Sequence, residues 1–209
     1  MAEKIVFYTH PMSRGRIVRW MLEEVGVPYQ AEILQFGTTM KDAEYRAVNS
    51  MGKVPTIVHG KTVVTECAAI CAYLADAFPE ASLAPPLKER GDYYRWMFFA
   101  AGPLEAAVTN KTLGVEVSKE RERMVGYGNY AEVISTLERT VGAHDFIGGY
   151  RFSAADVYVG SQIGWGLQFG TIEKRQAFVD YFGRLSERPA YKRATEIDDA
   201  LAREIKAAG

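Results

Sequence analysis

The chain has 209 residues, 48% hydrophobic and 24% charged, which is an ordinary globular balance for one large or two small domains. Its 25 Lys and Arg against 26 Asp and Glu give a formal net charge of −1, without the basic excess of a protein that binds nucleic acid or an anionic membrane. No apolar run approaches the ~20 residues of a membrane span, and charged Glu3 and Lys4 precede the first apolar run, unlike a signal peptide. We therefore expect a soluble, cytoplasmic protein.

The first 80 residues alternate strand-like and helix-like patterns. Residue type and period-two alternation predict four strands, at 5–8, 28–33, 54–58 and 62–64. Helical periodicity predicts three helices, at 14–25, 39–48 and 66–78. Gly26 closes the first helix, and His59-Gly60 separates the last two strands as the turn of a hairpin. The order β-α-β-α-β-β-α predicts a small α/β domain over 1–80, with a mixed sheet and helices on both faces.

Prolines then interrupt the pattern and mark residues 79–88 as a linker. We expect residues 88–209 to form an all-α domain, since no strand pattern follows. The stretch 131–141 has the apolar stripe of an amphipathic helix. The stretch 154–165 is apolar almost all round, which predicts a central, buried helix.

The start of that central helix is specified by its flanking residues. Ser153 and Asp156 have the spacing of a capping box, with Asp where Glu or Gln is usual. Phe152 and Val157 occupy the two positions of a hydrophobic staple. Four local residues therefore predict where this helix begins.

Several segments in this arrangement resemble the soluble glutathione transferases, in the bacterial type with a serine-type active-site loop. The segments are HPMSRGR at 10–16, NSMGKVP at 49–55, TECAAI at 65–70, FSAAD at 152–156 and RPAY at 188–191. Together they span nearly the whole chain. The resemblance implies a thioredoxin-like N-terminal domain that binds glutathione and a helical-bundle domain that supplies the pocket for an electrophile.

Val54-Pro55 is the first candidate contact for glutathione. A proline at the start of a strand cannot donate to the sheet ladder. The resemblance implies that Pro55 is cis and that the backbone of Val54 pairs with the cysteinyl unit of glutathione as an added strand. An edge-strand proline without a ligand is the alternative.

Glu66 and Cys67 begin the helix at 66–78. The free N–H groups of a helix N-terminus suit the γ-glutamyl carboxylate, and the Glu66 carboxylate suits the ammonium group. The family normally has Ser at the position of Cys67, so a hydroxyl donor becomes a weaker thiol donor. Glu66 could instead only complement the helix dipole. The resemblance also pairs Lys53 and, less directly, Lys41 with the glycine carboxylate, although exposed lysines are usually just solvated.

A metal site is not indicated. Cys67 and Cys71 lie four residues apart, too close for a disulfide framework. None of the three histidines is spaced to complete a metal site with them. We expect two small packing residues and no metal, with glutathione as the co-substrate that the resemblance implies.

Three residues are candidates to stabilise the glutathione thiolate. Ser13 precedes a helix whose dipole favours an anion, and its loop resembles the serine-type classes. Tyr8 ends the first strand, as the catalytic residue does in the tyrosine-type classes, but those place the following Arg-Gly-Arg about two residues closer. His10 is the third candidate. Ser13 is favoured, although it could be only an N-cap, and Tyr8 only a strand-end aromatic.

The second substrate is expected to be a small hydrophobic electrophile in a pocket between the domains. The candidate lining residues are Met12, Tyr93, Trp96, Phe99, Trp165 and Phe169. Aromatic residues at helical spacing are more often core. The resemblance further implies a homodimeric detoxification enzyme.

Two other functions stay open. A glutathione-dependent reductase or dehalogenase is one, although the reductase prefers a cysteine in the first loop, and residues 9–16 contain none. A non-catalytic binding module with the same fold is the other.

Overall fold

The computed structural model describes residues 3–208, which divide into two compact units. One unit contains the residues up to Ser82 together with the segment from Arg188 onward, and the other is Leu83–Glu187. This division differs from the expected helical domain over 88–209, because the last helix packs with the first unit. Among the described residues, no helix is both long enough and apolar enough to span a membrane.

The first unit is built on a four-stranded mixed sheet. Its strands are β1 (Ile5–Thr9), β2 (Tyr29–Ile33), β3 (Thr56–His59) and β4 (Thr62–Thr65), in the order β2-β1-β3-β4. Strands β1 and β2 are parallel, and β3 runs antiparallel to both β1 and β4. Along β1, the buried Ile5, Phe7 and Thr9 alternate with half-buried Val6 and Tyr8, so the strand has one fully covered face.

The described helices of this unit are α1 (Gly15–Val25), α2 (Ala43–Val48), α3 (Cys67–Ala77) and α9 (Pro189–Ala208), with short 3-10 turns η1 (Thr39–Lys41) and η2 (Pro79–Ala81). The element order confirms the predicted β-α-β-α-β-β-α arrangement. Gly26 ends α1 in the left-handed conformation, as expected. The predicted helix at 39–48 is divided into η1 and α2, because Asp42 between them is extended.

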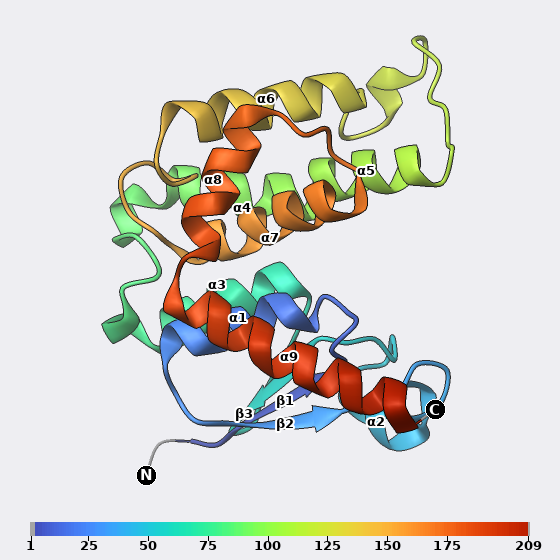
Figure 1. Ribbon diagram of the computed structural model, residues 1–209, viewed down its shortest axis with the longest axis vertical. Helices are drawn as coiled ribbons and strands as arrows, with labels where there is room; N and C mark the ends of the chain where they lie inside the picture. Colours follow the sequence, from blue (N-terminus) through green and yellow to red (C-terminus); the bar gives the residue numbers. More distant parts are fainter. Residues whose placement is uncertain (1–2, 209) are drawn as a thin grey trace. The chain divides into compact units, whose positions relative to one another are not determined.

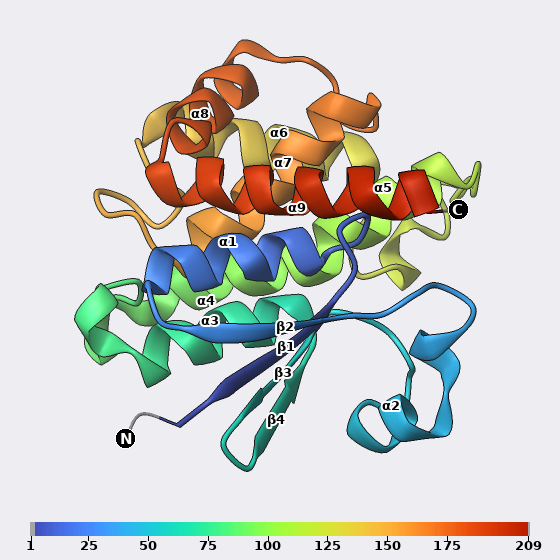
Figure 2. The ribbon, with the colours of Figure 1, turned by 60° about the horizontal axis from the view of Figure 1, so that its bottom comes forward.

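The last helix, α9, lies along α1, which in turn covers the sheet (Figure 2). Arg19 of α1 and Asp198 of α9 form an ion pair of 2.8 Å, with side chains only 2% and 1% exposed. Nearby, the Trp20 and Tyr191 rings meet edge to face at 4.9 Å. The segment from Arg188 onward is therefore part of the first unit.

The second unit is helical (Figure 1). Its described helical segments are η3 (Leu87–Glu89), α4 (Arg90–Phe99), the π-helical turn η4 (Ala100–Leu104), α5 (Glu105–Thr112), η5 (Glu122–Met124), α6 (Tyr130–Ala143), α7 (Ala154–Phe169) and α8 (Gln176–Ser186). Within the described part of this unit, the β-structure is one isolated bridge between Phe146 and Gly149. The absence of a strand agrees with the all-α expectation for this stretch.

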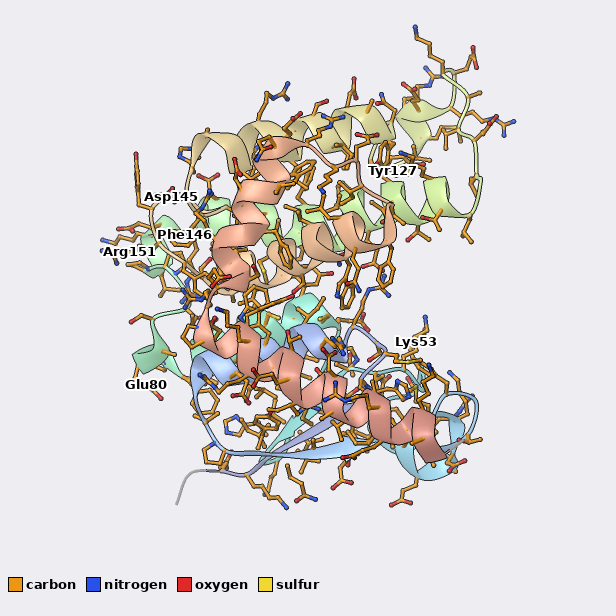
Figure 3. All side chains as sticks on the ribbon, in the orientation of Figure 1. Lys53, Glu80, Tyr127, Asp145, Phe146 and Arg151 are labelled. Atoms are coloured by element: carbon orange, nitrogen blue, oxygen red, sulfur yellow. The ribbon has the colours of Figure 1, made fainter. Side chains whose placement is uncertain are left out.

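Helix α7 is largely buried, and the predicted capping box at its start is present. The buried Asp156 carboxylate accepts hydrogen bonds from the main-chain N–H groups of Ser153 (2.9 Å) and Ile147 (2.7 Å). It also accepts one from the hydroxyl of Tyr181 on α8 (2.8 Å). Asp156 therefore ties the 144–152 loop, α7 and α8 together; Figure 3 labels Asp145, Phe146 and Arg151 in that loop.

Candidate functional site

The turn between β1 and α1 is held by its own side chains. The Ser13 hydroxyl donates to the His10 carbonyl oxygen (2.7 Å) and accepts from the Gly15 N–H (2.9 Å). The Ser13 side chain is half-buried, directly before the first turn of α1. It thus lies where the unpaired N–H groups and positive dipole end of α1 favour an anion.

His10 is buried beneath this turn and braces it. Its Nδ1 accepts a hydrogen bond from the Met12 N–H (3.1 Å), and its ring lies 4.3 Å from that of Phe36. Burial lowers the pKa of His10 below its ordinary value, with a partly opposing effect from a hydrogen bond to Gln35. The neutral imidazole is therefore the form that supports the loop, which makes His10 a structural member of the site.

Tyr8 belongs to the other face of the sheet. The covered face holds Phe7, over whose ring the Arg19 guanidinium of α1 lies, with its Cζ 5.3 Å from the ring centroid. Tyr8, one residue on, instead packs against Tyr45 of α2, with ring centroids 5.2 Å apart. Tyr8 and Ser13 are close in sequence, but only Ser13 lies at the start of α1.

The loop before β3 is clamped from α2. The carbonyl oxygen of Lys53 accepts hydrogen bonds from the Tyr45 hydroxyl (2.6 Å) and from the Asn49 amide (2.9 Å). The Val54–Pro55 peptide bond is cis, as the resemblance implies. Within the described residues, the N–H and C=O of half-buried Val54 make no hydrogen bond. A peptide backbone could pair with them as an additional strand.

The N-terminus of α3 lies beside that of α1. The Cys67 thiol, at the first position of α3, donates to the carbonyl oxygen of Arg14, the residue before α1, at 3.7 Å. Glu66 precedes α3 with a positive φ of 65°, a backbone region that non-glycine residues rarely adopt, and its side chain is exposed. Two helix N-termini thus gather at one place in the first unit.

The two candidate lysines differ in their surroundings. The Lys41 ammonium donates to the carbonyl oxygens of Gly52 (2.7 Å) and Met51 (3.2 Å) and so holds the turn before Lys53. Lys53 itself is exposed, and Figure 3 shows its side chain pointing outward from the loop. Lys53 is thus the one of the two whose ammonium is directed toward solvent.

The candidate electrophile residues lie in both units. Met12 is 69% exposed at the tip of the β1–α1 turn in the first unit. In the second unit, Trp96 of α4 is buried with its ring 5.2 Å from that of Phe99. Trp165 of α7 is half-buried. Tyr93 is buried and Phe169 exposed, so these aromatics range from core to surface.

Three supporting residues escaped the sequence analysis. A Cβ on Gly15 would lie 1.9 Å from Oγ1 of buried Thr9, so only glycine fits where α1 meets β1. Arg16 donates from Nε to the Pro11 carbonyl oxygen (2.6 Å). Tyr45 is buried within the stretch 39–48, for which the sequence predicted a helix and no site residue other than Lys41. Gly15 and Arg16 carried a sequence signal, since both belong to the Arg-Gly-Arg motif at 14–16, but neither contact was predicted from it.

Comparisons with known proteins agree with this geometry. Residues 12–77 match the family described as the N-terminal domain of glutathione S-transferase. Glutathione S-transferase A of Pleuronectes platessa is 28% identical over 186 residues, covering 82% of each chain. The crystal structure of a glutathione transferase from Methylococcus capsulatus is 26% identical, with a TM-score of 0.77 over 94% of this chain and 99% of that chain.

A glutathione transferase family member from Pseudomonas fluorescens, solved with two glutathione molecules bound, is 27% identical and covers 93% of each chain with a TM-score of 0.71. The family match lies in the first unit, and the two solved structures extend the likeness over both units. Residues 12–77 therefore carry the N-terminal domain of the glutathione S-transferase family, and the relatives and solved structures support a cytosolic-type glutathione S-transferase over the rest of the chain.

Proposed function

We propose that this protein is a glutathione transferase that adds the glutathione thiolate to small, hydrophobic electrophiles. The observation that carries the proposal is the meeting of the α1 and α3 N-termini, joined by the Cys67–Arg14 contact. Each N-terminus favours a negative charge. Glutathione brings two suitable anions, the thiolate for α1 and the γ-glutamyl carboxylate for α3.

The backbone of glutathione has a matching partner. The unpaired N–H and C=O of Val54 pair with the cysteinyl unit, next to Pro55. Glu66 takes the γ-glutamyl ammonium, and the main-chain N–H of Cys67 takes its carboxylate. Lys53 neutralises the glycine carboxylate. Lys41 supports the same end of the peptide by holding the 51–52 turn.

Ser13 is the residue proposed to hold the thiolate. Its hydroxyl proton now bonds the His10 carbonyl oxygen, and a thiolate is the stronger acceptor because charged acceptors make stronger hydrogen bonds. The packing of Tyr8 against α2, on the face of the sheet away from α1, favours Ser13 over Tyr8.

Lowering the pKa of the glutathione thiol can supply only a small part of the rate acceleration. Lowering a thiol pKa from ~8.5 to ~6.5 raises the ionised fraction at pH 7 from about 3% to about 75%. The less basic thiolate is about eightfold less nucleophilic, so the net gain is about threefold. Positioning of the electrophile against the sulfur must supply the remainder. Met12, exposed one residue before Ser13, is the proposed contact for the electrophile, and Trp96, Phe99 and Trp165 stay candidate lining residues predicted from the sequence.

The proposal includes a homodimer in the cytoplasm, acting in detoxification. Large apolar side chains on one face of α4 support the dimer, because Tyr94 and Phe98 are exposed at helical spacing, Phe98 by 72%. A second copy of the chain is the partner proposed for this face.

The test has three steps: retention on immobilised glutathione, an absorbance titration of the bound thiol, and turnover of 1-chloro-2,4-dinitrobenzene. In the last step the sulfur–carbon bond forms, chloride leaves and the thiol proton passes to solvent. We expect retention, a lowered thiol titration midpoint and turnover.

Substitutions then assign the thiolate-holding residue. Ser13→Ala should raise the midpoint, and Tyr8→Phe should leave it unchanged. Retention without turnover would indicate the non-catalytic module, and absence of retention would overturn the proposal. Undiminished turnover by Ser13→Ala, with loss in Tyr8→Phe, would move the role to Tyr8.

A further inference from the structure

Arg16, on the first turn of α1, joins the active-site turn to the last helix of the chain. Its Nε donates to the Pro11 carbonyl oxygen at 2.6 Å. Its Nη2 forms an ion pair with the Asp199 carboxylate of α9. One guanidinium thus contacts both a main-chain atom two residues before Ser13 and a carboxylate 183 residues away.

The segment that Arg16 holds is the one that places Ser13. The His10 carbonyl oxygen accepts from both the main-chain N–H (3.1 Å) and the hydroxyl of Ser13. Pro11 follows His10, and among the described residues Arg16 is the hydrogen-bond partner of its carbonyl oxygen. The orientation of the Arg16 side chain therefore bears on the placement of the Ser13 hydroxyl.

Asp199 is not needed to dock α9. The buried Arg19–Asp198 pair anchors the middle of the α1–α9 contact. At the other end of α1, Arg188 pairs with Glu24 at 2.6 Å and Arg193 pairs with Glu23 at 3.1 Å. The Arg16 and Asp199 side chains are 28% and 46% exposed, a setting in which an ion pair adds little to stability. What remains for Asp199 is to orient Arg16.

We infer that Asp199 is a positioning residue for catalysis, which fixes the His10–Ser13 turn through Arg16 and thereby places the hydroxyl that holds the thiolate. This inference rests on the proposed function. It predicts that loss of Asp199 changes the titration and reactivity of the glutathione sulfur. Binding of the two ends of glutathione should not change, because those ends are assigned to Lys53, Glu66 and Cys67.

The central variant is Asp199→Ala. We expect kcat with 1-chloro-2,4-dinitrobenzene to fall about tenfold, since a lost charge-assisted contact and a misplaced reacting group have effects of this order. The KM for glutathione should stay within about twofold, because the peptide contacts are intact. The titration midpoint of the bound thiol should rise. Asp199→Glu, which keeps the carboxylate, should retain most of the wild-type kcat and a thiol midpoint close to that of the wild type.

Arg193→Ala is the matched control, because it removes an exposed ion pair between the same two helices at the end distant from the turn. It should change neither kcat nor the thiol midpoint. If both variants lower the melting temperature equally while only Asp199→Ala shifts the midpoint, the effect is positional. Equal kinetic losses in both variants would overturn the inference and indicate a general role in docking α9.

A double-mutant cycle tests the route through Ser13. In a Ser13→Ala background, Asp199→Ala should cause no further rise of the thiol midpoint. If the midpoint shifts of Ser13→Ala and Asp199→Ala add fully in the double variant, Asp199 does not act through Ser13, and the proposed route is overturned. The failures are separable: a wild-type protein that is not retained on glutathione contradicts the proposed function, whereas a retained, active protein with an unshifted midpoint in Asp199→Ala contradicts only this inference.

Discussion

The hydroxyl of Tyr45 on α2 donates a 2.6 Å hydrogen bond to the carbonyl oxygen of Lys53, immediately before Val54–Pro55. The same hydroxyl lies 2.9 Å from Oγ1 of Thr56, the first residue of β3. Tyr45 thus contacts both sides of the dipeptide proposed to pair with glutathione. A helix outside the proposed glutathione contacts thus holds the backbone that is proposed to bind the peptide.

Tyr45→Phe should therefore weaken glutathione binding without removing any group proposed to touch it. A lost hydrogen bond of about 1 kcal/mol corresponds to a rise of about fivefold in the KM for glutathione. Tyr73→Phe is the control, because it removes a hydroxyl 3.0 Å from His59 Nδ1, elsewhere in the same unit. Steady-state kinetics check this, and an unchanged KM in Tyr45→Phe would show that the loop holds its position without the clamp.

Gly15→Ala should displace the first turn of α1. The added Cβ would lie 1.9 Å from Thr9 Oγ1 and 3.0 Å from Ser13 Oγ. Overpacking of this kind typically costs about 1–3 kcal/mol. Gly183→Ala in α8 is the control, because nothing lies within 4 Å of its added Cβ and alanine is the better helix former. Urea denaturation should show destabilisation only for Gly15→Ala, accompanied by loss of turnover.

The stability of the protein should fall on mild acidification because of His10. Burial lowers its pKa in the folded state below the ordinary 6.5. As the pH falls below about 6.5, the unfolded chain takes up a proton that the folded protein does not, so the free energy of unfolding decreases. Protonation of Nδ1 would also end its acceptance of the Met12 N–H.

His10→Asn tests this dependence, because asparagine offers an acceptor that does not titrate. Urea denaturation between about pH 5 and 8 should show a smaller loss of stability on acidification in the variant than in the wild type. Parallel curves would exclude His10 as the source.

Replacing one member of the buried Arg19–Asp198 ion pair should strongly lower the free energy of unfolding. Within the described residues, Arg19 Nη2 and Asp198 Oδ2 have no hydrogen-bond partner, so the pair is incompletely satisfied. Asp198→Ala leaves a buried, uncompensated guanidinium and should cost about 3–5 kcal/mol in the free energy of unfolding. The double variant Arg19→Met, Asp198→Leu should recover much of this loss, because an apolar pair replaces two desolvated charges. Chemical denaturation compares the single variant with the double variant. An equal decrease in the free energy of unfolding in both would contradict this prediction.

Local patterns were sufficient for the four strands of the first unit, for its helices α1 and α3, and for the start of α7. Each element carries its own periodicity, and the Gly26 stop and the Ser153–Asp156 capping box act over a few residues. Helical periodicity also predicted that Glu66 and Cys67 begin a helix, and they lie at the start of α3. These features can be predicted from the sequence because each depends on residues that are close together in the chain.

The features that hold the site in place depend on distant contacts. Asp198 and Arg19 are 179 residues apart, and each has the appearance of a solvated charge in its own helix. The approach of Gly15 to Thr9 and the burial of Tyr45 depend on packing between elements. Ser13 could be proposed from its position before α1, but the bonds of its hydroxyl to His10 and Gly15 follow from the turn geometry.

The assignment of α9 to the first unit has a consequence for synthesis on the ribosome. Leu83–Glu187 is continuous and can complete its internal contacts without the segment from Arg188 onward. The first unit cannot, because Asp198 and Asp199 are translated after the whole second unit, and until then Arg19 and Arg16 lack their ion-pair partners. The part of the protein that is translated first is therefore the last to mature, and a released chain truncated after Glu187 should contain a folded second unit beside a first unit that is still incomplete.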